Sequence, residues 1–265
     1  MNERSATRSR RTAILQTVRH SAASVEVLAS EFGVTPSTIR RDLAALTKQG
    51  ELTRTYGGAA PATNRVEGSL SERARQASRA KHAIALWAES QIVAGETVIL
   101  DAGTTAGQVA RALHTRSDIT VVTPSLSAML ELADSAGIRV VGLGGELRQL
   151  SQGFVGPLAE AALEKLTVDR LFLGADGITA DFGVCEAEAT QTRLKELMMR
   201  RAREIYVLAD SSKIGKRPFH AWAPMPARWT LVTDDGASLD ELQKFVTTGA
   251  RVVIVDAGGN GRELP

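Results

Sequence analysis

The sequence predicts an α/β protein with an N-terminal winged helix-turn-helix domain followed by a mostly parallel sheet that helices cover on both faces. Short amphipathic helices with marked beginnings and ends fill the first 50 residues. After residue 96, short β-branched runs alternate with helix-like stretches, which is the pattern of a doubly covered parallel sheet. We expect the first domain to span 1–60, a linker to span 61–80 and the α/β domain to span 81–265.

Charge is distributed unevenly along the chain. Residues 1–80 contain 13 Lys and Arg against 7 Asp and Glu, a net charge of +6, which leaves −4 for residues 81–265 within the total of +2. A basic N-terminal part followed by a mildly acidic remainder indicates a polyanion-binding module joined to a domain that does not bind polyanions. The sequence has no run of ~18 apolar residues, no apolar secretion segment and only one cysteine, Cys185. We therefore expect a cytoplasmic protein without membrane contact.

Two helices are predicted before residue 34. Residues 1–10 are polar and arginine-rich and are expected to form a loose arm. The apolar residues Ile14, Leu15 and Val18 then indicate a helix that ends near residue 20. Ser24 is the expected N-cap of the second helix, and Gly33 ends it. The apolar residues of this helix have the spacing i, i+3, i+4 and i+7: Val25, Leu28, Ala29 and Phe32.

The next helix, expected over 35–49, has well-marked boundaries and two different faces. Thr35 suits the N-cap, Pro36 the first helical position and Gly50 the C-terminal stop. At ~100° per residue, one face is apolar and is expected to pack: Ile39, Leu43 and Leu46. The outward side chains are hydroxyl-bearing or cationic: Ser37, Thr38, Arg40, Arg41 and Lys48.

These helices together are typical of a helix-turn-helix unit, because the joining turn is tight and contains glycine. Hydroxyl and guanidinium groups at a helix N-terminus can read base edges and phosphates in the DNA major groove. Residues 51–56 alternate like a strand and run into Gly57-Gly58-Ala59, which predicts a hairpin wing with Arg54 near the DNA backbone. For residues 35–49 taken alone, a solvated surface helix is the alternative.

The second part contains seven short apolar runs that predict buried strands: 97–101, 119–123, 139–143, 170–173, 205–208, 230–233 and 251–255. Helix-like stretches lie between most of them: 105–114, 125–135, 157–166, 188–203 and 238–247. Strands that alternate with helices in this way predict a mostly parallel sheet with both faces covered.

Glycines, hydroxyls and charged residues follow these strands, where ligands bind in open parallel sheets. Asp101-Ala-Gly-Thr-Thr105 could hold a phosphate at the start of a helix, with a helix-capping turn that binds no ligand as the alternative. Gly142-Leu-Gly-Gly145 lacks the dinucleotide-binding spacing, so we interpret it as a tight turn. Further strand-end groups are Thr123, Gly144, Asp176 and Lys213. Together these groups suit a phosphorylated sugar or polyol.

Many of these residues fall into runs that resemble the DeoR family of bacterial transcriptional regulators. Three runs resemble the winged helix of the family: Phe32-Gly33-Val34, Thr38-Ile39-Arg40-Arg41-Asp42-Leu43 and Tyr56-Gly57-Gly58-Ala59. The sensor domain of the family is similar in fold to ribose-5-phosphate isomerase. Three further runs resemble this domain: Asp101-Ala-Gly-Thr-Thr105, Gly174-Ala-Asp-Gly177 and Asp210-Ser-Ser-Lys213. The sequence departs from the usual family pattern at Thr35, Tyr56, Pro124 and Cys185-Glu-Ala-Glu188.

The resemblance implies a regulator, most simply a repressor, that binds double-stranded operator DNA as a homo-oligomer and is released by a small phosphorylated sugar or polyol. The expected DNA contacts are Ser37, Thr38, Arg40, Arg41, Lys48 and Arg54. The effector contacts that it implies are Asp101, Gly103, Thr104, Thr105, Asp176 and Lys213, to which the strand-end argument adds Thr123 and Gly144.

The alternative is a sugar-phosphate isomerase with an accessory DNA-binding domain. The isomerases that share this fold carry an Asp-Gly-Ala-Asp-Glu motif, and the corresponding run here is Leu173-Gly-Ala-Asp-Gly177. Two of the three carboxylates are absent, although isomerisation needs a carboxylate base, so the sequence favours a sensor. The four histidines are dispersed and Cys185 has no spaced partner, so we expect no metal site and no cofactor.

Overall fold

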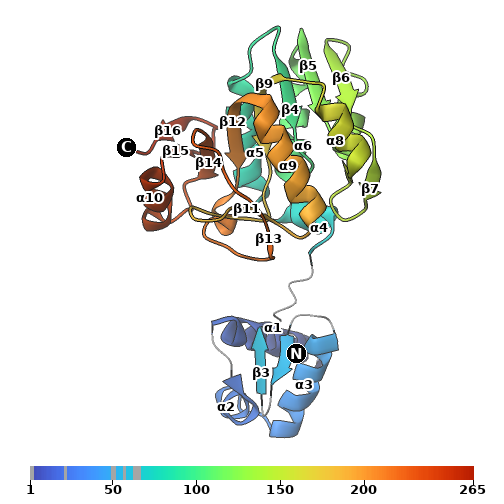
Figure 1. Cartoon of the computed structure of the whole chain (residues 1–265). Coiled ribbons are helices and arrows are strands. Elements are labelled where there is room, and N and C mark those ends of the chain that lie inside the picture. The colour runs from blue at the N-terminus through green and yellow to red at the C-terminus, as the bar shows by residue number, and fades with distance from the viewer. Residues whose placement is uncertain (1–2, 21–22, 49–51, 56–57, 62–66) are drawn as a thin grey trace. The chain divides into compact units, whose positions relative to one another are not determined.

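A computed structural model of the chain describes residues 3–20, 23–48, 52–55, 58–61 and 67–265 (Figure 1). The chain forms two compact units, Met1–Val66 and Glu67–Pro265. Among the helices in these described ranges, none is long and apolar enough to cross a membrane.

The first unit contains three helices in its described residues: α1 (Glu3–His20), α2 (Val25–Glu31) and α3 (Pro36–Lys48). Its strands form a small sheet in the order β1-β3-β2: β1 (Ala23–Ser24), β2 (Leu52–Thr55) and β3 (Gly58–Pro61). The prediction of a loose arm over 1–10 is wrong, because α1 already begins at Glu3. Arg10, the last residue of that arm, and the following Arg11 both form ion pairs with Asp42 on α3.

The predicted helix boundaries and wing are confirmed where the structure describes them. The Ser24 hydroxyl caps α2 by accepting from the Val27 amide at 3.2 Å. Thr35 Oγ1 likewise accepts from the amide of Thr38 at 3.3 Å. The expected apolar stripe forms the core of the unit: Ile39, Leu43 and Leu46 are all buried. β2 pairs antiparallel with β3 as the wing requires, whereas the expected helix stop at Gly50 and the turn residues Tyr56 and Gly57 lie outside the described residues.

An eight-stranded sheet forms the centre of the second unit, in the order β16-β15-β14-β12-β9-β4-β5-β6. Seven of its strands are parallel and are the seven predicted from the sequence: β4 (Thr97–Leu100), β5 (Ile119–Thr123), β6 (Ile138–Gly142), β9 (Val168–Leu173), β12 (Ala202–Leu208), β14 (Thr230–Asp234) and β15 (Arg251–Val255). The eighth, β16 (Gly261–Glu263), is antiparallel and was not predicted.

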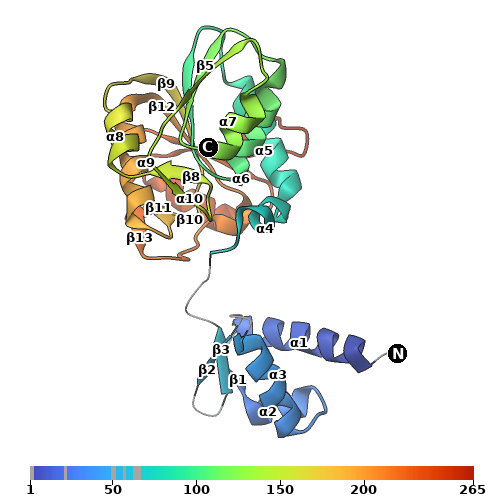
Figure 2. The same ribbon diagram turned by 90° about the vertical axis from the view of Figure 1, so that its right-hand side faces the viewer.

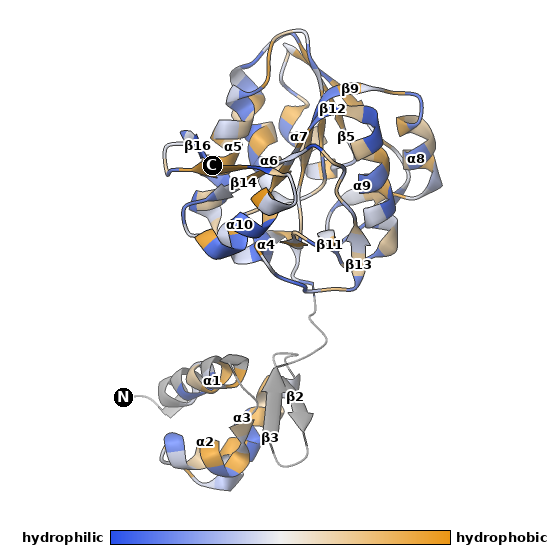
Figure 3. Ribbon diagram, turned by 60° about the vertical axis from the view of Figure 1, so that its left-hand side comes forward, coloured by the Kyte–Doolittle hydropathy of each residue, from blue (hydrophilic) through white to orange (hydrophobic). Residues whose placement is uncertain are grey.

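Helices cover both faces of this sheet, as predicted (Figure 2). One face packs against α5 (Ser78–Ser90), α6 (Thr104–Ala112) and α7 (Leu126–Leu132), and the other against α8 (Pro157–Leu163), α9 (Ala189–Arg201) and α10 (Leu239–Thr247). Alternation along the strands supplies both cores: in β9, Phe172 faces the first layer while Leu171 and Leu173 face the second. Figure 3, coloured by hydropathy, shows that hydrophobic and hydrophilic stretches alternate along the covering helices.

The second unit begins earlier in the chain than the expected start at residue 81. Glu67 is its first residue, and helix α4 (Leu70–Arg75) and the first turn of α5 precede Lys81. Two small sheets add to the unit: β7 (Glu146–Arg148) with β8 (Gly153–Val155), and β10 (Gly177–Thr179), β11 (Gly183–Glu186) and β13 (Ala221–Ala223). The α4 segment belongs here because ion pairs of Glu67 and Arg73 tie it to the carboxyl edge of the large sheet.

Candidate functional site

The first candidate site is the outward side of α3. Ser37 and Arg41 are exposed, and Thr38 is half-buried. The hydroxyls of Ser37 and Thr38 each lie 2.9 Å from Thr35 Oγ1, so three hydroxyls meet at the start of the helix. Arg40 is also exposed and lies 4.0 Å from Glu26 on α2. These side chains are therefore available to an external partner, while nothing is described of the Lys48 and Arg54 side chains.

A buried carboxylate that was not predicted holds α3 in place. Asp42 is 2% exposed, and its two oxygens accept from Arg10 Nε and Arg11 Nε at 2.8 Å each. Asp42 follows Arg41 directly, so the residue that fixes the helix and the residue that faces outward are neighbours in sequence. In the sequence, this role could have been inferred from the position of the Asp42 carboxylate, directly before Leu43 of the apolar stripe.

The second candidate site lies at the carboxyl edge of the large sheet. The chain runs from β4 through β5 to β6 in one direction, and from β9 through β12 to β14 in the other. The direction of winding therefore changes between β4 and β9, and ligands of open parallel sheets bind at such a switch point. Asp101 follows β4, and Gly174-Ala-Asp176 follows β9, so both flank this point.

Asp101 is part of a buried charged cluster. It is 4% exposed, and its Oδ2 accepts from the Gly174 amide at 3.0 Å and from Lys195 Nζ of α9. Lys195 also forms an ion pair with Glu186 of β11 at 3.0 Å. Burial acts to lower the pKa of Lys195, but Asp101 and Glu186 outweigh it and hold that pKa above its usual value. Burial raises the pKa of Glu186 to about 7, against the opposing effect of Lys195.

A second group of charges comes from α4 and the β7–β8 hairpin. Arg73 donates to Asp176 Oδ1 at 2.9 Å and to the carbonyl of Leu150 at 3.0 Å. The buried carboxylate of Glu67 binds Arg148 with both oxygens and lies 3.3 Å from Arg73. The predicted strand-end carboxylate Asp176 is therefore held by a guanidinium from the segment that opens the second unit.

Cations gather on the same edge. Lys213 donates to the carbonyl of Ala175, and Lys81 donates to the carbonyl of Arg73. Burial, together with the nearby charges of Lys213 and Arg73, lowers the pKa of Lys81 to about 8, while Asp210 opposes this shift. Neighbouring cations of this kind are favourable for an anion.

The other predicted effector residues lie around this edge in different environments. Gly103 is the N-cap of α6, at a φ of 151°, and nothing lies where its Cβ would be. Thr104 is half-buried and Thr105 is buried in the first turn of that helix. Thr123 is fully buried, and its hydroxyl donates to the Leu100 carbonyl at 2.6 Å, so it joins the ends of β4 and β5. Gly144 is exposed beyond the end of β6.

A narrow cavity of about 10 Å³, close to the space that one water molecule needs, lies at this edge. It is lined by residues that follow β4, by the β8 strand and by the first turns of α9: Asp101, Ala102, Pro124, Ser151, Gly153, Phe154, Val155, Gln191, Leu194 and Lys195. Sequence reasoning missed Ser151, Gln191 and Lys195 as site residues. For Lys195 a signal existed, because the lysine lies beside Leu194 on the buried side of a helix.

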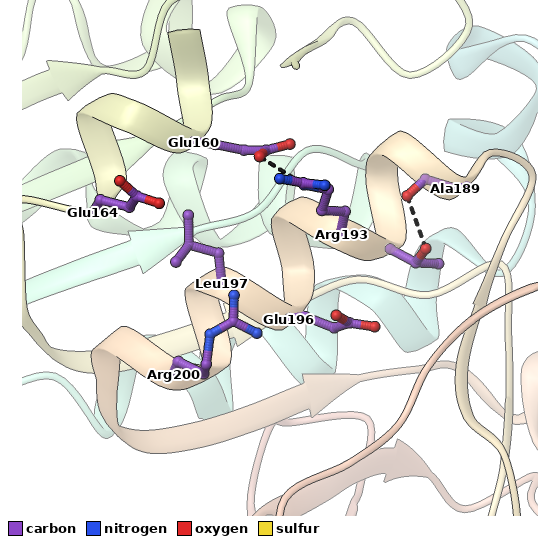
Figure 4. A pocket seen from close by; sticks show the side chains of 8 residues that line it. Glu160, Glu164, Ala189, Arg193, Glu196, Leu197 and Arg200 are labelled. Carbon is purple, nitrogen blue, oxygen red and sulfur yellow. Dashed lines mark hydrogen bonds and ion pairs between the residues drawn. The ribbon is translucent and has the colours of Figure 1, made fainter. Parts of the chain in front are cut away.

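A larger and more open groove of about 450 Å³ lies between α8 and α9 (Figure 4). Two of its charged residues, Arg193 and Glu160, form an ion pair at 2.7 Å. Its eight lining residues all belong to the described part of the chain, and none of them carries a buried polar atom without a partner. The strand-end cavity does contain such atoms, on Ser151 and Gln191, which makes it the stronger candidate for a ligand site.

Comparison with known proteins identifies the family of both domains. Residues 10–65 match the family model of the DeoR-like helix-turn-helix domain, and residues 76–235 match that of the DeoR C terminal sensor domain. The chain belongs to the DeoR family of transcriptional regulators. It is a DeoR-family transcriptional repressor that binds DNA through its helix-turn-helix domain and carries an effector-binding sensor domain.

Several relatives resemble this DeoR-family chain over most of its length. It is 34% identical to the HTH-type transcriptional regulator GlpR of Haloferax volcanii, over 87% of this chain and 90% of that protein. It is 35% identical to the transcriptional repressor AccR of Agrobacterium fabrum, over 79% and 82% respectively. It is 33% identical to the glycerol-3-phosphate regulon repressor of Escherichia coli, over 73% and 77%. These relatives are transcriptional regulators and not enzymes, so they give the isomerase alternative no support.

Among solved structures, ribose 5-phosphate isomerase A from Methanocaldococcus jannaschii matches 50% of this chain and 52% of its own, with 21% identity and a TM-score of 0.38. A likeness this weak carries no argument about ligand or activity.

Proposed function

We propose that this DeoR-family protein represses transcription in the cytoplasm by binding operator DNA with α3, and that a small phosphorylated sugar or polyol releases it. The effector site in this proposal is the carboxyl edge of the large sheet around Asp101, Asp176 and Lys213. The proposal rests on one observation: cations, a helix N-terminus and unpartnered buried polar atoms lie together at the switch point of the sheet.

For DNA binding, the proposal assigns base and phosphate contacts to the outward side of α3. Ser37 and Thr38 lie at the helix N-terminus, where amides and hydroxyls favour phosphate oxygens. Arg40 and Arg41 can reach base edges or phosphates because neither is held by a close ion pair in the described part of the chain. Lys48 and Arg54 are assigned backbone contacts from the sequence. Repressors of this kind bind as dimers or higher oligomers, with one recognition helix for each half-site.

For the effector, we assign the phosphate to the start of α6. The amides of Thr104 and Thr105 lie at the positive end of this helix, and Gly103 leaves the approach to them open. Lys213 uses one of its three N–H donors on the Ala175 carbonyl, which leaves capacity for a phosphate oxygen. The shared positive potential of Arg73, Lys81 and Lys213 favours an anion at this edge. One relative is named for a regulon of glycerol 3-phosphate, which is a phosphorylated polyol.

Release from DNA follows from differential binding. An effector that binds one arrangement of the sensor domain more tightly than another shifts the population toward it, and the coupling to DNA is reciprocal. If that arrangement holds the recognition helices of an oligomer at the wrong half-site spacing, operator affinity falls.

A screen of phosphorylated sugars and polyols tests this proposal directly. The purified full-length protein is melted in the presence of each compound, and each compound is then added to a protein–operator complex. We expect at least one compound both to raise the melting temperature and to release the DNA. Inorganic phosphate serves as the control for a non-specific anion effect. If no phosphorylated compound does either, the proposed effector class is wrong.

A further inference from the structure

Four buried polar atoms without a hydrogen-bond partner gather at the carboxyl edge of the large sheet: Arg73 Nε, Ser151 Oγ, Asp176 Oδ2 and Gln191 Oε1. Ser151 is 2% and Gln191 is 8% exposed, and the Asp176 side chain is 8% exposed. An unpaired buried polar atom costs ~1 to 3 kcal/mol, so several in one place are unusual for a region whose only role is structural.

The four atoms come from four segments of the chain, which two sets of contacts and one cavity bring to the same edge. Arg73 binds both Asp176 and the carbonyl of Leu150, the residue before Ser151. Gln191 donates to Glu186 at 3.1 Å, and Glu186 pairs with Lys195. Ser151, Gln191 and Lys195 line the same narrow cavity. We call Arg73, Ser151, Asp176 and Gln191 the polar quartet.

The chemistry of the polar quartet defines what would satisfy it. Asp176 Oδ2 and Gln191 Oε1 only accept, Arg73 Nε only donates, and the Ser151 hydroxyl does both. A phosphate carries mainly acceptors, so it would leave the two acceptors of the quartet unsatisfied. Neighbouring hydroxyl groups of a polyol can donate to one atom while they accept from another. The quartet therefore complements hydroxyl groups and not the phosphate.

We propose that the polar quartet is the subsite for the hydroxyl-bearing end of the effector and that Arg73 transmits its occupancy toward the DNA-binding unit. The inference rests on the proposed effector class and adds to it an orientation: hydroxyls at the quartet and phosphate at the start of α6. Nothing in the family assignment or in the names of the relatives places Arg73, Ser151 or Gln191 in a binding site.

Arg73 is suited to transmission because of its place in the chain. It lies on α4, six residues after Glu67, where the second unit begins. Its contacts to Asp176, Glu67 and the Leu150 carbonyl hold this short helix against the sheet edge. A ligand hydroxyl that accepts from Arg73 Nε and donates to Asp176 alters these contacts directly. Binding at the quartet thus changes how firmly the segment that follows the DNA-binding unit is docked.

Ser151→Ala tests the subsite, because it removes a hydroxyl that has no partner and so no existing hydrogen bond is lost. The melting temperature of the free protein should stay unchanged or rise, while binding of glycerol 3-phosphate or ribose 5-phosphate, whichever the wild type binds, should weaken about five-fold. Propyl phosphate, which has no hydroxyl groups, should bind wild type and variant equally. Thr233→Val is the matched control: Thr233 Oγ1 is also buried without a partner but lies on β14, outside the quartet.

Arg73→Met tests the transmission, with Arg75→Met on the same helix as the control, since Arg75 is exposed. Loss of a charge-assisted hydrogen bond should weaken binding of the same polyol phosphate about 10- to 100-fold. At saturating ligand, Arg73→Met should remain on the operator, whereas Arg75→Met should be released as the wild type is.

The outcomes separate the two proposals. If no phosphorylated compound shifts the wild type, the proposed effector class fails and the quartet assignment fails with it. If the wild type responds but Ser151→Ala and Arg73→Met bind and respond equally well, the effector proposal stands and the quartet assignment is wrong. A fall in the melting temperature of Ser151→Ala without a ligand effect would also contradict it, because it would mark a structural hydroxyl.

Discussion

Replacement of Asp42 by Asn should loosen the DNA-binding unit without touching the outward side of α3. Asp42 is 2% exposed and accepts two charge-assisted hydrogen bonds of 2.8 Å, from Arg10 and Arg11. Breaking a buried ion pair on one side costs ~3 to 5 kcal/mol. The arginine side chains are 21% and 30% exposed, so water screens part of this cost. Asn also retains one acceptor, so we expect a loss of about 2 to 3 kcal/mol.

Hydrogen exchange of the full-length protein, followed by mass spectrometry, measures this effect within the first unit. A loss of 2 to 3 kcal/mol corresponds to roughly 30- to 150-fold faster exchange in α1 and α3, with α5 to α10 unchanged. Glu26→Gln is the matched control, because Glu26 is exposed and its contact to Arg40 of 4.0 Å should contribute almost nothing. If Asp42→Asn exchanges no faster than Glu26→Gln, the buried ion pairs do not hold α3.

Three further predictions concern function and pH. Arg41→Ala should weaken operator binding by about 1 to 3 kcal/mol in a titration at fixed salt, and unchanged affinity would remove Arg41 from the interface. Lys213→Ala and Thr104→Ala should each lose the effector response in a DNA-release assay yet bind operator normally, and a retained response would contradict the phosphate assignment. Burial raises the pKa of Glu186 from 4.5 to about 7, so folding favours the protonated carboxyl group. The contribution of Glu186 to the stability of the fold is therefore complete below pH 4.5 and is lost as the pH rises through 7. Glu186→Gln should therefore melt with less pH dependence than the wild type between pH 5 and 8, and an identical profile would show that Glu186 does not titrate there.

The sheet could be predicted from the sequence because each buried strand needs apolar residues on both faces. Val168–Leu173 and Arg251–Val255 are rich in Val, Leu and Ile and have no competing pattern. The antiparallel strand Gly261–Glu263 could not be predicted in the same way. All of its residues are exposed, and it is held by backbone pairing with β15. Its sequence therefore carries no hydrophobic signal.

The candidate site was only partly predictable for a related reason. Asp101, Asp176 and Lys213 follow apolar strands, and the rule that ligands bind at strand ends finds them. Arg73 and Glu67 lie in a polar segment whose helix α4 buries no side chain fully, so hydrophobic periodicity gives no signal there. Their position depends on ion pairs with Asp176 and Arg148, which are distant in sequence. Long-range pairing of charges leaves no local pattern in a single sequence.

The buried charges at the sheet edge suit a sensor better than they suit a rigid scaffold. The attraction within a buried ion pair is largely offset by desolvation, so such a pair adds little net stability, whereas removal of one partner is strongly destabilising. Arg73 is held between Asp176 and Glu67, and Glu67 is itself held by Arg148. A ligand that gives Asp176 or Arg73 a new partner therefore shifts the free energy of α4 docking through very few contacts. An apolar contact in the same place would hold α4 equally well but would not respond to a polar ligand.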